Sequence, residues 1–322
     1  MRRFITYAIL FALIVLFTLG SGEYIVRSLP NPYKHKHQWM LSNASEVECL
    51  IMGSSHTYYG ISPTYFLPNT FNLANVSQNP KYDYLLLEKY MPLCHKLHSV
   101  VLPVSYFTFF DKSFEEGDEW FYAINYKLYM DIDEHPCWSR YNFEFSNRPV
   151  YSGKLQTFLS GKSLPTCDSL GFGLGYVLDA KDKVLWEHNA YITVDRHTAD
   201  DGTIRAENEV FLRRIAQLCR DNNINLILIT PPSWSAYYQL LDKNQLNKTY
   251  EIVHKICNDY TLPYFDYLKD PRFLEEDFYD CDHLTDAGAK KFTTILKHDL
   301  TERTPWISSN PSAQIFHQGI KR

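Results

Sequence analysis

The order of apolar and polar positions along the chain predicts an alternation of strands and helices. Short apolar runs of the kind that form strands buried on both faces lie at 47–52, 70–74, 99–102, 224–230 and 263–267. Segments with helical spacing lie at 82–91, 206–220, 249–259 and after Asp286. This alternation predicts an α/β fold with a mainly parallel sheet, in which ligands bind beyond the carboxyl ends of the strands.

The N-terminus carries the longest apolar run, the 17 uncharged and mostly apolar positions from Phe4 to Gly20. As a helix this run is roughly 25 Å long, slightly less than a hydrocarbon core of about 30 Å. Because Arg2 and Arg3 precede it, we expect a cytoplasmic N-terminus and an extracytoplasmic soluble domain, in the periplasm or at the cell surface. The alternative is a signal peptide cleaved near Gly20-Ser21-Gly22.

The alternation is interrupted over residues 106–205, which we interpret as an insertion with its own aromatic clusters. These rings either form a small core or line a groove in which sugar rings stack. The predicted organisation is an anchor (1–22), a linker (23–46), an α/β domain (47–302) and a mobile tail (303–322). The aromatic clusters are Tyr106 to Phe110, Trp120 to Tyr122 and Tyr126 to Tyr129. Further candidates for the groove are Trp138, Trp186, Tyr191 and His197.

Composition excludes some classes of function. A formal net charge of -5 gives no footprint for nucleic acid. Seven cysteines in 322 residues are too few for a disulfide scaffold, although Cys137 and Cys167 could pair in an oxidising compartment. The basic segment Lys34-His35-Lys36-His37 is interpreted as a contact with lipid headgroups, with a metal site as the weaker alternative.

Two short motifs carry the candidate chemistry. Gly53-Ser54-Ser55-His56 follows the first predicted strand, where a glycine permits a sharp turn, and Asp280-Cys281-Asp282-His283 precedes the last predicted helix. A serine hydroxyl becomes a nucleophile when an imidazole takes its proton and a carboxylate orients that imidazole. For Gly-Ser-Ser alone, an ordinary helix cap is the simpler interpretation.

Taken together, the motifs resemble those of the SGNH (GDSL-type) hydrolases. The resemblance implies a three-layer, flavodoxin-like sandwich in which Ser55 is the nucleophile, His283 the base and Asp280 the orienting carboxylate. Asp282 is the second choice for that carboxylate. Cys281 would still need a separate base in order to act as a nucleophile. No cofactor and no metal are implied.

The family's oxyanion donors are not all present. No glycine follows the second strand, and Ser105 stands where the family places an asparagine after the third. One missing donor typically costs about 10²- to 10³-fold in turnover. The remaining candidates are the Ser55 N–H and the side chains of Asn75, Ser77, Gln78 and Ser105.

An anchored domain with these departures resembles the branch of the alginate O-acetylation and D-alanyl-lipoteichoic acid biosynthesis proteins. By that resemblance we expect a serine acyltransferase or esterase acting on envelope polysaccharide. Its expected partners are an envelope glycan or acyl donor and a multi-pass membrane acyltransferase. The alternatives are an inactive glycan-binding or scaffold subunit and, third, a lipid esterase.

Overall fold

The computed structural model describes the chain except for residues 135–139, 163, 178–185, 201 and 304–322. The predicted tail therefore lies almost wholly outside the described residues, as do Cys137, Trp138 and the side chain of Trp186. The chain divides into two compact units. The anchor unit comprises residues 1–37 and 114–166, and the sheet unit comprises 38–113 and 167–322.

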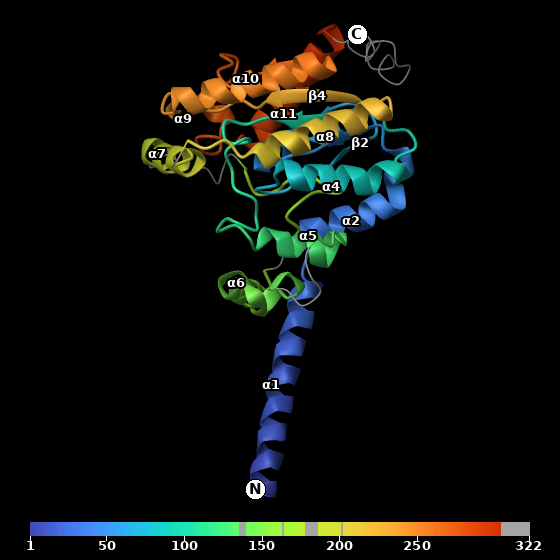
Figure 1. The fold of residues 1–322 in the computed structure, drawn as a ribbon, viewed down its shortest axis with the longest axis vertical. Helices are drawn as coiled ribbons and strands as arrows, with labels where there is room; N and C mark the ends of the chain where they lie inside the picture. Colours follow the sequence, from blue (N-terminus) through green and yellow to red (C-terminus); the bar gives the residue numbers. More distant parts are fainter. Residues whose placement is uncertain (135–139, 163, 178–185, 201, 304–322) are drawn as a thin grey trace. The chain divides into compact units, whose positions relative to one another are not determined.

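A five-stranded parallel sheet is the centre of the sheet unit (Figure 1). Its order is β2-β1-β3-β4-β5, so the chain reverses its direction of travel across the sheet between β1 and β3. Ligands bind at such a switch point in open α/β sheets. The strands are β1 (Cys49–Ile51), β2 (Thr70–Asn72), β3 (Ser99–Pro103), β4 (Asn225–Thr230) and β5 (Tyr264–Asp266).

Helices cover both faces of this sheet because alternate strand residues point to opposite sides. Ile51, Val101 and Ile227 pack with Phe292 and Leu296 of α11 (Asp286–Arg303) in one buried cluster. On the other side α8 (Ala206–Asp221) contacts α4 (Pro80–Tyr90), α10 (Lys243–Tyr260) and β4. The predicted α/β sandwich with a parallel sheet is confirmed. The unit also contains α3 (Ser55–Tyr58), α7 (Trp186–His197), α9 (Ser235–Tyr238) and part of α2 (Pro32–Asn43).

Some element bounds differ from those predicted. Helix α10 begins at Lys243, six residues before the predicted start, because the side chain of Asp242 accepts a hydrogen bond from the Gln245 N–H at 2.8 Å. Asp242 is therefore the N-cap, a role that its short acceptor side chain favours. The segment predicted as a linker is mostly helical. Within it the Lys36 side chain is fully buried, so Lys36 does not contact lipid headgroups as expected.

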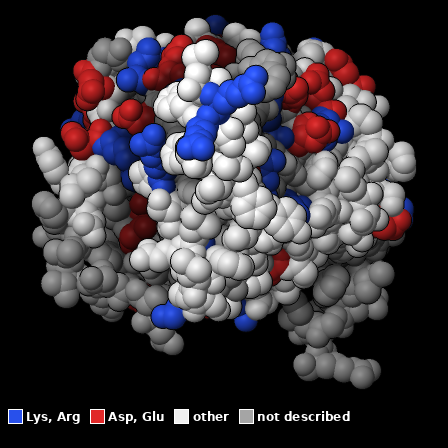
Figure 2. Space-filling view, turned by 90° about the horizontal axis from the view of Figure 1, so that it is seen from below, with Lys and Arg blue, Asp and Glu red and all other residues white. Residues whose placement is uncertain are grey.

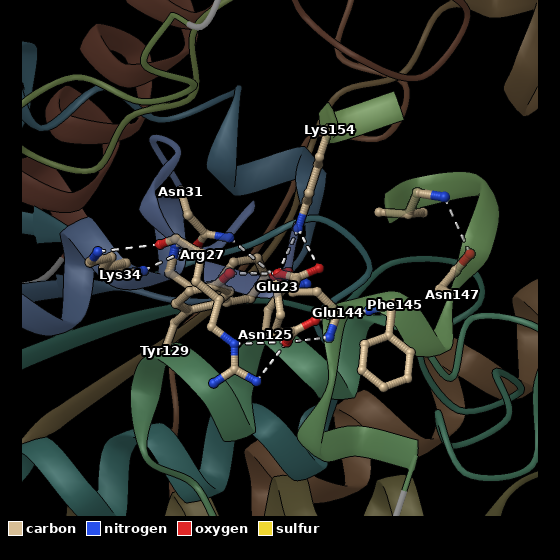
Figure 3. A network of polar contacts seen from close by, with 12 residues as sticks. Glu23, Arg27, Asn31, Lys34, Asn125, Tyr129, Glu144, Phe145, Asn147 and Lys154 are labelled. Carbon is tan, nitrogen blue, oxygen red and sulfur yellow. Dashed lines mark hydrogen bonds and ion pairs between the residues drawn. The ribbon is translucent and has the colours of Figure 1, made fainter. Parts of the chain in front are cut away.

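The anchor unit is built on α1 (Arg2–Ser28), which is long and apolar enough to cross a membrane. Its other helices are α5 (Tyr122–Met130) and α6 (Arg148–Leu159), and α6 contacts α1. At the C-terminal end of α1, Glu23 accepts hydrogen bonds from the Arg27 side chain at 2.7 Å and the Glu144 N–H at 2.8 Å (Figure 3). Glu144 in turn accepts from Lys154 at 2.7 Å and from the Tyr129 hydroxyl at 2.5 Å.

The predicted insertion contributes to both units. The aromatic clusters at 120–122 and 126–129 belong to the anchor unit, whereas 106–110 belongs to the sheet unit. In the anchor unit the Arg140 guanidinium lies 4.1 Å from the centre of the Trp120 ring, and the Tyr33 and Tyr126 rings meet edge to face at 5.0 Å. Tyr126 is fully buried. These contacts match the interpretation of the rings as a small core.

Candidate active site

The turn after β1 lifts Ser55 out of the sheet edge. Gly53 has a φ of +104°, and a Cβ on it would lie 2.1 Å from the ring of Pro103 at the end of β3. A glycine is therefore needed both for the backbone conformation and for the close approach of the two strand ends. Ser55 begins α3, so its N–H has no acceptor within that helix.

The second motif forms a tight loop that presents His283 to Ser55. Phe278 and Leu284 pair across the base of the loop in an antiparallel bridge. The Asp280 carboxylate accepts from the N–H groups of Asp282 at 3.0 Å and His283 at 2.7 Å, which fixes the turn. From the neighbouring loop after β4, the Trp234 N–H donates to the Cys281 carbonyl at 2.9 Å.

The structure brings the three predicted catalytic side chains together. The Ser55 Oγ lies 2.8 Å from the His283 Nε2, and both Asp280 carboxylate oxygens lie 3.1 Å from the His283 Nδ1. A proton on Nδ1 satisfies the carboxylate and leaves Nε2 as the acceptor for the serine hydroxyl. This is the geometry required for a histidine to act as a general base toward Ser55.

Asp282 is a second carboxylate on the same imidazole. Its Oδ1 lies 3.2 Å from the His283 Nδ1, and its Oδ2 lies 3.1 Å from the Nε2 of His56. The Asp282 side chain is 2 % exposed, compared with 34 % for Asp280. The turn lets both carboxylates reach the His283 Nδ1, so the distance to His283 does not separate Asp280 from Asp282.

These carboxylates determine the charge state of the histidine. Burial disfavours the charged imidazolium of His283, but Asp282 and then Asp280 outweigh burial and hold its pKa well above the usual value. Burial likewise opposes ionisation of Asp282. Its hydrogen bonds and attraction to His283 and His56 nevertheless keep the pKa of Asp282 well below its usual range. The loop therefore contains a buried carboxylate anion shared by two imidazoles.

His56, which had no predicted role, also belongs to this site. Its ring stacks on His283 with centres 4.8 Å apart, and its Nδ1 faces the hydroxyls of Ser105 at 3.3 Å and Ser54 at 3.5 Å. The Asp282 anion accepts a hydrogen bond from the His56 Nε2, and the His56 Nδ1 is the atom that faces those two hydroxyls. The one feature of the sequence that could have indicated the place of His56 at the site is its position directly after Ser55 in the first motif.

Two predicted oxyanion donors are engaged elsewhere. The Asn75 amide nitrogen donates to the Gln78 side-chain oxygen at 2.8 Å, and the Gln78 amide donates to the buried Asp83 at 2.6 Å. Asp83 also accepts from the Gly53 N–H at 2.8 Å, and burial raises its pKa to about 7. Asn75 and Gln78 therefore brace the turn under Gly53. Ser77 lies beside them with a φ of +56°.

Three stacked tyrosines border His283. The Tyr176 ring stacks between Tyr59 at 3.9 Å and Tyr279 at 4.2 Å and meets the His283 ring edge-on at 5.3 Å. None of the three was singled out from the sequence, since they come from separate segments that only the fold brings together.

The other candidate residues lie around this centre. The His197 Nδ1 is 2.8 Å from the Tyr237 hydroxyl, and burial lowers the pKa of His197 to about 3, so this imidazole is neutral. Burial raises the pKa of the Cys281 thiol, which keeps it protonated and disfavours it as a nucleophile. Tyr191 is exposed on α7. The suggested pairing of Cys137 with Cys167 stays a prediction.

Two groups of described residues have donor atoms close enough for a metal ion, namely His56 with Asp282 and His283, and Asp280 with Cys281 and Asp282. His56, Asp282 and His283 each offer an atom within 4.8 Å of the others. These same atoms are paired with one another in hydrogen bonds, so a bound metal would compete with the hydrogen bonds that orient His283. The arrangement fits a proton-transferring site better than a metal centre.

Residues 193–300 match the model of a family described as a protein of unknown function (DUF1574). No match was found among curated proteins.

Several solved structures are similar. An acetyl xylan esterase is 14 % identical, with 79 % of this chain and 100 % of that chain covered and a TM-score of 0.39. A GDSL-like lipase from Bacteroides thetaiotaomicron is 11 % identical, with 84 % and 99 % covered and a TM-score of 0.39. A lipase/acylhydrolase from Enterococcus faecalis is 12 % identical, with 80 % and 97 % covered and a TM-score of 0.37. Similarity at this level assigns no activity, so the chemistry has to be inferred from the geometry of the site itself.

Proposed function

We propose that this protein is a serine esterase or acyltransferase that works through an acyl-Ser55 intermediate. The observation that carries the proposal is the chain of contacts from the Ser55 Oγ to the His283 Nε2 and from the His283 Nδ1 to two carboxylates. A serine that begins the helix after a strand and faces a histidine paired with two carboxylates has the arrangement of an activated nucleophile.

The reaction follows from these positions. Ser55 attacks an acyl carbonyl while His283 takes the hydroxyl proton, and His283 then returns that proton to the leaving alcohol. In the second half His283 deprotonates an incoming hydroxyl, which attacks the acyl carbon and releases Ser55. The Ser55 N–H is the candidate donor to the oxyanion, since the side-chain nitrogens of Asn75 and Gln78 are already engaged.

Within this proposal the acceptor is a hydroxyl of a cell-envelope polysaccharide, and the enzyme is anchored by α1 with the sheet unit outside the cytoplasm. The apolar α1 supports the anchor. The stacked tyrosines beside His283 support an acceptor with flat apolar faces, as sugar rings have. A multi-pass membrane acyltransferase would then supply the acyl group. A lipid esterase is the variant in which the acceptor is water and the substrate lies in the bilayer.

A non-catalytic glycan-binding or scaffold subunit is the second candidate. The observation in its favour is the engagement of Asn75 and Gln78 in the support of Gly53, which leaves few donors for an oxyanion.

A serine-directed fluorophosphonate probe on the purified full chain separates these candidates. We expect the wild type to be labelled, Ser55→Ala to be unlabelled and His283→Ala to be labelled at least about 10²-fold more slowly. Ser54→Ala is the matched control, because its hydroxyl faces His56 and not His283, and it should be labelled normally. Equal labelling of wild type and Ser55→Ala would contradict the proposal. An unlabelled wild type that still binds envelope glycan would favour the scaffold.

A further inference from the structure

The C-terminal end of α1 is tied rigidly to the rest of the anchor unit. The Glu23 and Glu144 side chains are buried and are neutralised by Arg27 and Lys154 (Figure 3). The Arg27 guanidinium also donates to the Asn142 carbonyl at 2.7 Å. Because a buried ionic network is costly to break once formed, this end of α1 fixes the height of the attached segments along the helix.

Helix α6 meets α1 just beyond the end of the apolar run. The Tyr151 hydroxyl of α6 packs so closely on Gly22 that a Cβ there would lie 2.0 Å from it. Gly22 is two residues, or about 3 Å along the helix, beyond Gly20. The polar layer on each side of a hydrocarbon core is about 5–7 Å thick, so a bilayer spanned by the apolar run would have its headgroups at the level of this contact. In Figure 1, α6 lies across α1 and not along it.

The segment formed by α6 and the residues after it has the composition of a membrane-surface element. Residues 147–166 include Arg148, Lys154 and Lys162 but no acidic residue. Apolar side chains are nevertheless exposed there: Leu159 is 81 % exposed and Leu164 is 75 % exposed. Exposed apolar and basic side chains on one short segment are typical of elements that lie in the interface of an anionic bilayer.

The surface of α1 is consistent with this placement. Its large apolar side chains are exposed along the whole run, from Phe4 to Leu19. Figure 2, which looks along α1 from its N-terminal end, shows basic side chains in front of a broad area of uncharged ones. The first acidic residue of the chain is Glu23, and it is the residue engaged by the polar network.

We propose that residues 147–162 and 164–166 rest in the headgroup layer of the membrane that α1 spans, with Phe158, Leu159 and Leu164 inserted among the lipids and Arg148 and Lys162 against anionic headgroups. In this arrangement the contacts of the anchor unit with the membrane surface set the depth and tilt of α1 in the bilayer. This inference rests on the anchor in the proposed function but not on the chemistry of Ser55.

The occupant of this surface is a lipid bilayer and not a second protein, because the exposed apolar residues lie beside the helix that carries the apolar run. Contact with a protein would require the same surface to exclude lipid at the level where α1 leaves the membrane. The segment's excess of basic residues also complements anionic headgroups.

Depth-dependent fluorescence quenching of the full chain in proteoliposomes tests the proposal. An environment-sensitive dye is attached to a single introduced cysteine, Leu159→Cys, Leu13→Cys or Lys248→Cys, in a Cys137→Ser background whose other six cysteines are buried. The vesicles contain phosphatidylglycerol and phosphatidylcholine brominated either near the headgroup or near the chain end. Lys248 is exposed on α10 and serves as the control in water.

We expect the dye at Leu159 to be blue-shifted and quenched mainly by lipids brominated near the headgroup. The dye at Leu13 should be quenched mainly by lipids brominated near the chain end, and the dye at Lys248 by neither. The quenching at Leu159 should weaken in vesicles of phosphatidylcholine alone and in an Arg148→Glu, Lys162→Glu variant.

The other outcomes overturn the proposal in distinguishable ways. A dye at Leu159 that emits as in water while Leu13 is quenched would place residues 147–162 and 164–166 in solvent. A dye at Leu159 that is blue-shifted but unquenched would show that a protein surface, such as a second copy, covers it. If the dye at Leu13 is also unquenched, α1 does not span the membrane, and the proposed position of the anchor unit at the membrane surface is wrong as well. Fluorophosphonate labelling of Ser55 in the same sample reports on the chemistry independently.

Discussion

At the scale of single residues, the most informative feature is the pair of carboxylates on one imidazole. Asp280 is partly exposed and also fixes the loop through its bonds to backbone N–H groups, whereas Asp282 is buried between His283 and His56. Charge is screened less in a buried position, so Asp282 exerts the stronger electrostatic effect on His283. Asp280 therefore mainly fixes the loop, whereas Asp282 mainly stabilises the protonated form of His283.

These different roles predict that the Asp280→Asn and Asp282→Asn variants differ in how the rate of Ser55 acylation depends on pH. His283 must be neutral to accept the Ser55 proton, and its pKa is raised, so wild-type acylation should increase with pH through a pKa above the usual histidine value. Asp282→Asn removes the largest raising influence, so its profile should shift to lower pH, with a rate reduced by roughly 10²- to 10⁴-fold. Asp280→Asn should shift the profile less. The measurement is the pH dependence of fluorophosphonate labelling, and a larger shift for Asp280→Asn would contradict these roles.

At the scale of elements, the first βα turn is held by its neighbours. Gly53 has a conformation that favours glycine, lies against Pro103 of the next strand and donates its N–H to the buried Asp83. The side chains of Asn75 and Gln78 complete that support. Asn75 and Gln78, which were expected to donate to the oxyanion, thus stabilise the turn that presents Ser55.

Gly53→Ala should therefore lower both the stability of the protein and the rate of Ser55 labelling, although it adds only one methyl group. The added methyl group meets a rigid proline ring and the backbone conformation is unfavourable, so we expect a loss of about 1–3 kcal/mol in stability and slower labelling of Ser55. Thermal unfolding measures the first effect. Gly153→Ala in α6 is the matched control, because no heavy atom outside its own stretch of helix lies within 4 Å of the added Cβ, and it should be neutral or stabilising by up to about 1 kcal/mol. Equal losses in the two variants would argue against strain at Gly53.

At the scale of the whole molecule, the question is whether the apolar run stays on the mature protein. Helix α1 continues without a break through Gly20-Ser21-Gly22 to Ser28, and its last turns carry Glu23 and Arg27 of the polar network. Cleavage in the small-residue segment would cut the helix immediately before that network. The structure thus gives the residues around the alternative cleavage site a role within an intact helix.

We accordingly expect the mature protein to retain its N-terminus. Intact-mass measurement of the protein purified from membranes should give about the full 37.8 kDa, and salt or alkaline washing should leave it in the membrane fraction. Replacing both Arg2 and Arg3 with Glu should reduce correct insertion, since those charges set the orientation. A mature chain beginning near Glu23 would show that the segment is a signal peptide.

The sequence by itself determined the α/β alternation, the parallel sheet, the apolar helix and the two motifs, because these depend on local periodicity and on residues close together in the chain. The trio of Ser55, His283 and Asp280 could be named because each member lies in a short motif at a recognisable position. Tertiary structure alone decided the rest. It placed His56 on Asp282, directed Asn75 and Gln78 to Asp83, and stacked three tyrosines from separate segments beside His283. Such contacts depend on the directions of side chains that meet across long separations in sequence, and no local pattern records those directions.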